Sequence, residues 1–292
     1  MEGNACSQDI VDIDNMMMAL ERFRDNMGIS EVHLTGGEPT LHHGIIELVS
    51  SISKAGFVVK MTTNGTNHID RYMQIADAGL SELNVSMHTM DADALGAIME
   101  PQRSIRWAEK AIETQMETCA VMSGKLKVKV NTCVASDESE AVKIAGYAKS
   151  HNLVWRPMNV LEVLDEAFDA LSRMGEKLGA VPVMANVSSG SSACSVVMRD
   201  PDGFEFKVKL IRPFLIGSLC DGCPLIESGR CYEYLYGPRI EFDNGLRVRS
   251  CLHRQGSPYV LSVADYFRSQ TFVGLCEVLR RSRLTSSVFN RP

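Results

Sequence analysis

The sequence predicts an α/β protein with a parallel sheet, followed by a cysteine-rich α+β region. Strand-type and helix-type segments alternate from about residue 14 to residue 178. A Gly-Gly turn stands between one such strand and the next helix, and several of the nine cysteines gather between residues 220 and 251. Alternation of this kind is typical of parallel strands joined by right-handed helical crossovers.

The expected elements follow in order. A first helix over 14–26 has apolar residues at helical spacing and ends before Gly28. The expected strands are 32–35, 58–62, 83–87, 126–134 and 154–160. The expected helices between and after them are 44–55, 69–78, 92–118, 140–150 and 164–178. Asp137 and Glu140 fit a capping box at the start of the helix over 140–150.

The character of the chain changes at residue 183. Residues 187–192 are rich in serine and glycine and predict a loop, and 204–210 is a β-type run. Residues 240–249 predict a hairpin around Asp243-Asn244-Gly245, and 263–283 is helical. We therefore expect two domains, a parallel α/β domain over 1–182 and a cysteine-rich domain over 183–292.

Composition narrows the function classes. The net charge of −6 argues against a general nucleic-acid or membrane-surface binder. No apolar run reaches the roughly 20 residues of a membrane helix, and the polar start is no signal peptide. We therefore expect a cytoplasmic protein whose cysteines are reduced thiols or metal ligands.

The most informative segment is Leu34-Thr35-Gly36-Gly37-Glu38-Pro39-Thr40-Leu41. It lies at the carboxyl end of an expected strand, where ligands bind in parallel α/β proteins. Two glycines let a ligand approach the backbone, and Glu38 offers a carboxylate for an ammonium group. A chance Gly-Gly in an ordinary turn is the alternative.

Polar residues also follow the next strands. Thr63-Asn64 ends the second strand, Ser86 lies at the end of the third, and Lys129 and Asn131 share one face of the fourth. A buried lysine needs an anionic partner, so an inward Lys129 indicates a phosphate or a carboxylate. Taken singly, each of these residues could instead be a cap, a turn residue or an exposed side chain.

The turn and the strand ends resemble the radical S-adenosylmethionine (SAM) superfamily, and in particular the GTP 3′,8-cyclase of molybdenum-cofactor biosynthesis. The resemblance runs from Met1 to about Arg283. It implies a partial parallel (β/α) barrel of six strands, the first lying upstream of this chain. It also implies SAM as a cofactor, held by Gly36, Gly37, Glu38, Pro39, Asn64, Ser86, Asn131 and Leu161. The substrate residues that it implies are His33, Thr63, Lys129, Arg156 and Arg239.

One part of the superfamily pattern is missing. Its catalytic iron–sulfur cluster is held by Cys-x3-Cys-x2-Cys, whereas Cys6 is the only cysteine here before Cys119. We expect that the chain begins a few residues too late, and natural loss of the cluster is the alternative. Whether the protein is an enzyme is therefore open, and the chain as given is expected to be inactive in SAM cleavage.

A second cysteine group resembles the auxiliary [4Fe–4S] site of the cyclase family. Cys220, Cys223 and Cys251 match its three ligands, while Cys231 lies in an insertion and could close the open iron position. Thiolates at this spacing also fit a zinc ribbon. Arg239 matches a family arginine, but Glu241 replaces the second, which disfavours a triphosphate.

The resemblance thus implies a radical SAM enzyme that forms a 5′-deoxyadenosyl radical and modifies a substrate near an auxiliary cluster, and Glu241 indicates that this substrate is not GTP. Its partners would be a small-molecule or peptide substrate and an electron donor such as flavodoxin or ferredoxin. The alternatives are a non-catalytic relative that binds SAM or a nucleotide, a peptide-modifying radical SAM enzyme, and a zinc-stabilised binding module.

Overall fold

The computed structural model describes residues 13–99, 103–187, 193–211, 215–229, 231, 238–242 and 245–278. The chain divides into two compact units. The barrel unit comprises Ser30–Ala185 and Ser195–Leu210. The cysteine unit comprises Met1–Ile29, Asn186–Cys194 and Ile211–Pro292.

The barrel unit is built on an eight-stranded sheet of order β1-β2-β3-β4-β5-β8-β7-β6. Its first five strands are β1 (Glu31–Leu34), β2 (Val58–Thr63), β3 (Leu80–Ser86), β4 (Lys127–Val134) and β5 (Val154–Asn159). Each is parallel to the next, and β5 is also parallel to β8 (Glu205–Ile211) through Met158 and Lys209. The sheet ends with β7 (Ala193–Arg199) and β6 (Val181–Val187).

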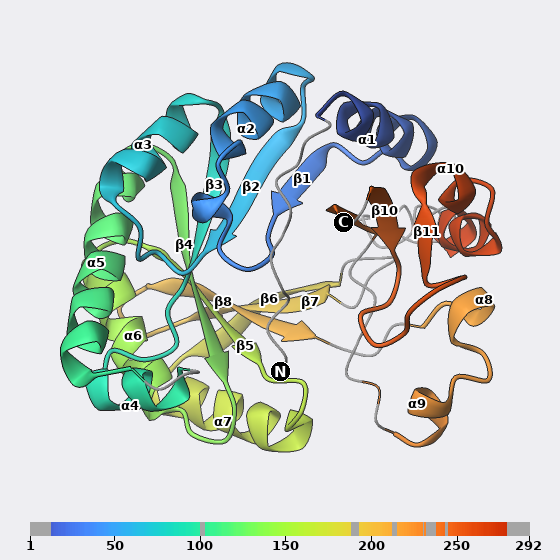
Figure 1. Ribbon diagram of the computed structural model, residues 1–292. Coiled ribbons are helices and arrows are strands. Elements are labelled where there is room, and N and C mark those ends of the chain that lie inside the picture. Colours follow the sequence, from blue (N-terminus) through green and yellow to red (C-terminus); the bar gives the residue numbers. More distant parts are fainter. Residues whose placement is uncertain are drawn as a thin grey trace, which may run out of the picture. The chain divides into compact units, whose positions relative to one another are not determined.

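Helices line the outer face of this sheet (Figure 1). They are α2 (Ile45–Lys54), α3 (Ile69–Asp77), α4 (Ala92–Ile98), α5 (Ile105–Ser123), α6 (Ser139–Ser150) and α7 (Leu164–Lys177), with the short 3-10 helix η1 (Pro39–Leu41) after β1.

Strand alternation separates an apolar face from a polar one. The side chains facing the helices are fully buried, including Val59, Met61, Leu83, Val85, Val130 and Trp155. Residues at the intervening positions, such as Lys60, Asn84 and Arg156, lie on the inner face. Burial of the apolar face stabilises the sheet, and the inner face is left for polar chemistry.

The cysteine unit packs its first helix, α1 (Ile13–Met27), against residues from the other end of the chain. Its core is formed by Phe23, Met27, Ile216, Leu219, Val248, Tyr266 and Leu275. The other elements are α8 (Gly217–Cys220), α9 (Pro224–Glu227), β9 (Arg239–Phe242), β10 (Leu246–Arg249), β11 (Val260–Ser262) and α10 (Val263–Tyr266). Strands β9, β10 and β11 form an antiparallel sheet of order β11-β10-β9.

The α/β class, the five parallel strands and the β9–β10 hairpin are confirmed. Two details of the prediction are wrong. The single helix over 92–118 is two helices, because Asp91 and Ser104 each cap a separate start. The capping box is absent, because the Glu140 carboxylate accepts hydrogen bonds from Thr89 Oγ1 and Met90 N instead.

The domain boundary at 182/183 does not coincide with the division into units. Strands β7 and β8 belong to the same eight-stranded sheet as β1–β5, and α1 packs with the C-terminal core. Residues 188–192, 243–244 and 279–283, which fall in the expected loop, hairpin turn and last helix, lie outside the described residues. Among the residues that the structure describes, no helix is long and apolar enough to cross a membrane.

Candidate functional site

The turn after β1 exposes its backbone. Gly36 and Gly37 have φ angles of 99° and 29°, in the region that favours glycine. A Cβ atom added at either residue would meet nothing within 4 Å. The two glycines are therefore required by the backbone conformation, and they leave open space in which a ligand can touch main-chain groups.

The Glu38 carboxylate holds this turn from within the protein. Its Oε1 accepts hydrogen bonds from Thr40 N (3.1 Å), Thr40 Oγ1 (2.6 Å) and Thr63 Oγ1 (2.7 Å), and its Oε2 accepts one from Asn64 N (2.7 Å). Thr63 is only 2% exposed. These bonds join the end of β1 to the end of β2. The Glu38 carboxylate and the Thr63 hydroxyl, which were expected to contact ligands, thus bind groups of the protein itself.

The strand ends carrying the other expected cofactor residues are also joined. Gln115 Nε2 of α5 donates to the carbonyls of Asn64 (2.6 Å) and Ser86 (3.2 Å), which connects β2 with β3. Met87 N donates to the Asn131 carbonyl at 2.9 Å, which connects β3 with β4. Leu161 lies just beyond the end of β5, after Val160. Gln115 has no motif around it, so sequence inspection misses it.

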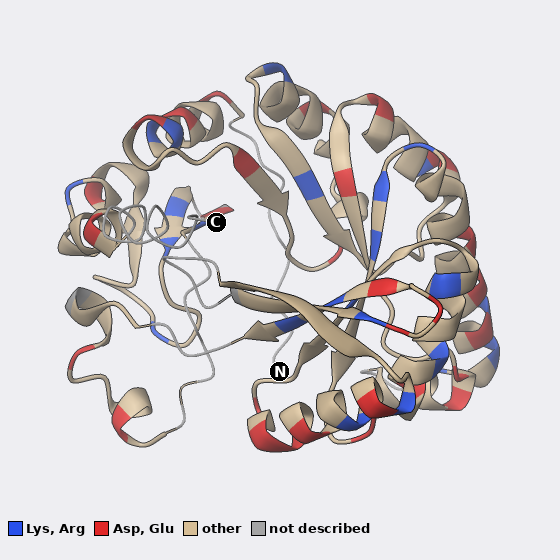
Figure 2. Cartoon of the chain, turned by 180° about the vertical axis from the view of Figure 1, so that it is seen from behind, with Lys and Arg blue, Asp and Glu red and all other residues tan. Residues whose placement is uncertain are grey.

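Charged side chains alternate along the inner face, and Figure 2 shows both signs on the strands. Lys60 Nζ lies 2.6 Å from Glu31 Oε2. Lys129 Nζ lies 2.6 Å from Glu82 Oε1, and Lys127 Nζ lies 3.8 Å from Glu82 Oε2. The anionic partner expected for Lys129 is thus a carboxylate of the chain itself, on the neighbouring strand.

Burial and the ion pair act against each other in these two groups. Burial acts to raise the pKa of Glu82, but its hydrogen bond to Lys129 and the nearby lysines lower the pKa overall. Burial lowers the pKa of Lys129, the salt bridge to Glu82 opposes this, and Arg156 and Lys127 add to the lowering.

A polar network crosses the inner face beside this ion pair. Arg156 donates through Nε to Asn131 Oδ1 (2.8 Å) and through Nη2 to Asn84 Oδ1 (3.2 Å). Asn84 Nδ2 lies 3.2 Å from the Met61 carbonyl oxygen and 3.4 Å from His33 Nε2. His33 Nε2 is also 2.8 Å from Thr62 Oγ1. Asn84 therefore connects His33 with Arg156, and Arg156 joins Asn131 to the same network.

Cations dominate the surroundings of this network. Burial, followed by the charges of Arg156 and Lys209, lowers the pKa of His33 to about 4. Burial, followed by the charge of Arg156, lowers the pKa of Lys209 to about 8. Sequence reasoning missed Lys209. The alternating run Glu205-Phe206-Lys207-Val208-Lys209 is a signal that could have found it.

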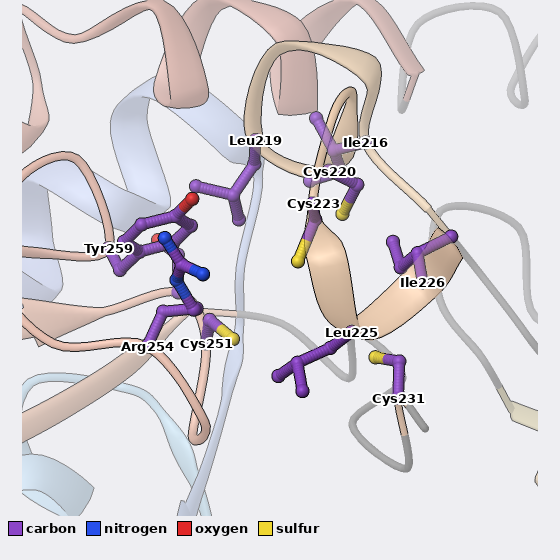
Figure 3. Close-up of a pocket in the computed structure, with 11 residues that line it drawn as sticks. Ile216, Leu219, Cys220, Cys223, Leu225, Ile226, Cys231, Cys251, Arg254 and Tyr259 are labelled. Carbon is purple, nitrogen blue, oxygen red and sulfur yellow. The ribbon is translucent and has the colours of Figure 1, made fainter. Parts of the chain in front are cut away.

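The cysteine unit contains a pocket onto which four thiols open (Figure 3). Cys220 and Cys223 come from α8 and the residues after it, Cys251 follows β10, and Cys231 also lines the pocket. Ile216, Leu219, Leu225 and Ile226 form apolar walls, and Arg254 and Tyr259 also contact the pocket. Burial raises the pKa of Cys220, and the neighbouring thiols of Cys231, Cys251 and Cys223 act in the same direction.

Soft thiolates in an apolar pocket are the donor set that zinc and iron–sulfur clusters use, so these residues fit either group. In the part of the chain that the structure describes, no three Cys, His, Asp or Glu side chains already form a group that could hold one metal ion.

The β9–β10 hairpin contains an ion pair between its two strands. Glu241 Oε2 lies 2.5 Å from Arg249 Nε, on the neighbouring strand. Arg239 stands opposite Arg249 in the β9–β10 register. The carboxylate that replaces an expected arginine is therefore balanced by Arg249, and Arg239 lies beside this pair.

Comparison with known proteins places these observations in context. Residues 5–128 match the Radical SAM superfamily. Over 281 residues the chain is 24% identical to proteins named "Probable GTP 3′,8-cyclase" from Saccharolobus islandicus and Saccharolobus solfataricus, with 92% of this chain and 82% of each relative covered. The protein of that name from Sulfolobus acidocaldarius is 23% identical over 283 residues, with 92% and 80% covered. The expected resemblance is confirmed.

Solved structures are more distant. The crystal structure of Streptococcus suis SuiB aligns with a TM-score of 0.48 and 17% identity, over 60% of this chain and 40% of that one. Archaeal TYW1 aligns with a TM-score of 0.41 and 17% identity, over 58% of this chain and 61% of that one.

Proposed function

Since residues 5–128 resemble the Radical SAM superfamily, we propose that the barrel unit binds SAM at the carboxyl edge of β1–β5, as part of a radical SAM enzyme acting on a substrate other than GTP. The observation that carries the proposal is the open backbone at Gly36-Gly37. Glu38 holds this backbone in place, and Asn64, Ser86 and Asn131 follow at the neighbouring strand ends.

The chain's own residues position and shield the ligand in this proposal. Main-chain groups at the Gly36-Gly37 turn would contact the amino acid part of SAM, and the polar inner face would hold the substrate. A reduced iron–sulfur cluster supplies the electron that cleaves SAM in this superfamily. Three thiolates hold that cluster, and Cys6 is the one cysteine before Cys119 in this sequence.

Calorimetry with SAM and the chain as given tests the binding site. Gly37→Val should abolish measurable binding, because the new side chain fills the open space and strains a positive φ. Gly203→Val is the matched control, since Gly203 has a φ of 87° and equally open space in a distant turn. Equal SAM affinity in both variants would exclude this turn as the site. Binding without SAM cleavage fits both the expected inactivity and the non-catalytic alternative.

We also propose that Cys220, Cys223, Cys251 and Cys231 hold an auxiliary [4Fe–4S] cluster. The support is that one pocket collects all four thiols. Bound iron and sulfide, measured after anaerobic reconstitution, should fall sharply in Cys220→Ala, Cys223→Ala and Cys251→Ala and stay unchanged in Cys194→Ala. A changed spectrum in Cys231→Ala would identify a fourth ligand. Tightly bound zinc without sulfide would favour the zinc-ribbon alternative.

A further inference from the structure

In the network of Arg156, Asn84 and His33, Arg156 fixes which group donates and which accepts in each hydrogen bond. A guanidinium group can only donate, so the Asn84 atom that faces Arg156 Nη2 must be the acceptor Oδ1. This orientation turns Asn84 Nδ2 toward the Met61 carbonyl oxygen and His33 Nε2. The Met61 carbonyl can only accept, so both neighbours of Asn84 require the same orientation of its amide.

The polarity of Asn84 decides which ring nitrogen of His33 carries the proton. Asn84 Nδ2 approaches His33 Nε2 as a donor, and the Thr62 hydroxyl can donate to the same nitrogen from 2.8 Å. Nε2 is therefore an acceptor, and a neutral imidazole then carries its proton on Nδ1. Among the described residues Nδ1 has no hydrogen-bond partner, and part of the His33 side chain is open to solvent.

The charges around His33 keep the ring neutral. Partial burial, Arg156 on β5, Lys209 on β8 and Lys60 on β2 all disfavour an imidazolium ion. Glu82 on β3 acts in the opposite sense, but it is paired with Lys129, and Glu31 on β1 is paired with Lys60. Because these effects bring the pKa of His33 to about 4, the ring is uncharged near pH 7.

We propose that His33 is a specificity-determining residue that presents a fixed, neutral Nδ1–H donor to a hydrogen-bond acceptor of the substrate, such as a carbonyl oxygen. This inference rests on the proposed function, because it treats the inner face as the substrate chamber. A neutral ring with Nε2 held as the acceptor offers the substrate one donor of fixed position, the Nδ1–H group.

Nitrogen NMR of the full chain tests the proposal without any enzymatic turnover. The seven histidines are labelled with ¹⁵N, and His33 is assigned from the resonance that disappears in His33→Gln. We expect the Nδ1-protonated tautomer from pH 5 to pH 8 with no titration in that range. An Nε2-protonated tautomer, or a protonation midpoint above pH 6, would overturn the proposal.

Two further measurements test the cause of the neutral ring and its persistence beside an anion. Asn84→Asp removes the donor to His33 and adds a carboxylate, so the pKa of His33 should rise by roughly one unit or more. Asn152→Asp, the same change at an exposed loop residue, should leave it unchanged. Titration with inorganic phosphate at pH 7 should leave the His33 ring neutral, and saturable protonation of His33 by phosphate would contradict a neutral donor.

Calorimetry with SAM on the same samples tests the proposed SAM site separately from the proposed role of His33. His33→Gln should keep the SAM affinity of the unaltered chain, because His33 is not among the residues proposed to bind SAM. Failure of SAM to bind, with the His33 tautomer as expected, would count against the proposed function alone. SAM binding with the wrong tautomer would count against His33 alone.

Discussion

At the scale of single residues, the site depends on backbone positions that only glycine fills easily. Gly65 lies directly after Asn64 and has a φ of 74°. A Cβ atom added there would lie 2.8 Å from Val85 Cγ1 and 3.3 Å from Gln115 Cγ. Val85 is fully buried and Gln115 joins two strand ends, so neither side chain can move without disturbing the edge of the sheet.

Gly65→Ala should therefore lower the free energy of unfolding by about 1–3 kcal/mol, from a strained φ and a clash in the core. Chemical denaturation followed by circular dichroism measures this loss. Gly203→Ala is the control, because its φ of 87° brings the same backbone strain with open space around the new methyl group. If both variants lose the same stability, the clash with Val85 contributes nothing.

At the scale of helices and strands, Glu138 links the start of α6 to α7. Its carboxylate lies 3.0 Å from Arg173 Nη2 and 2.7 Å from Lys177 Nζ. The hydrogen bonds to Lys177 and then Arg173 lower the pKa of Glu138 to about 2, from an ordinary value of 4.5. The stabilisation is therefore complete above pH 4.5 and is lost as the pH falls toward 2.

Glu138→Gln should lower the melting temperature at pH 7 and flatten its decline between pH 4.5 and pH 2, since the neutral amide has no proton to gain. Melting curves across this range test the prediction. Glu166→Gln, at the exposed start of α7, controls for the loss of a surface charge. An unchanged decline in Glu138→Gln would show that other carboxyl groups control acid unfolding.

Sequence patterns predicted those strands whose own residues form a recognisable β-type run. Strands β1–β5 are short β-type runs between helical runs, so both their existence and their parallel order could be predicted. Strand β6 could not, because every residue from Val181 to Val187 is exposed and no buried alternation marks the strand. Its conformation comes from pairing in the sheet, which is a tertiary effect.

The same distinction applies to the site. The Gly36-Gly37 turn is visible in the sequence because the residues that form it are adjacent. The contact between Asn84 and Arg156 joins residues 72 positions apart, and only the register of β3, β4 and β5 creates it. The Glu82–Lys129 pair depends on the same register, so the lysine could be predicted to face inward, but its partner could not.

At the scale of the whole molecule, the two units should respond differently to metal removal. Both tryptophans, Trp107 and Trp155, belong to the barrel unit, whereas the thiol pocket belongs to the cysteine unit. Metal bound only by the folded state stabilises the unit that holds it. Tryptophan fluorescence therefore reports unfolding of the barrel unit and is insensitive to unfolding of the other.

Tyr266 lies in the core of the cysteine unit, so the near-ultraviolet circular dichroism of tyrosine reports unfolding of that unit. Removal of the metal from the reconstituted protein with a chelator should lower the unfolding midpoint measured by this signal. The fluorescence midpoint should stay within experimental error. The Cys251→Ala protein, treated in the same way, is the control, because it should already lack the metal. Equal shifts of both midpoints would mean that the two units unfold as one.

The packing of α1 has a consequence for synthesis on the ribosome. Phe23 and Met27 are made early, yet they pack against Val248, Tyr266 and Leu275, which are made more than 200 residues later. At roughly 5–20 residues per second, α1 waits about 10–50 seconds with its apolar side chains exposed while the barrel unit emerges. The nascent chain therefore has a long interval in which a chaperone can bind α1, and a stall before Val248 leaves that helix without its folding partner.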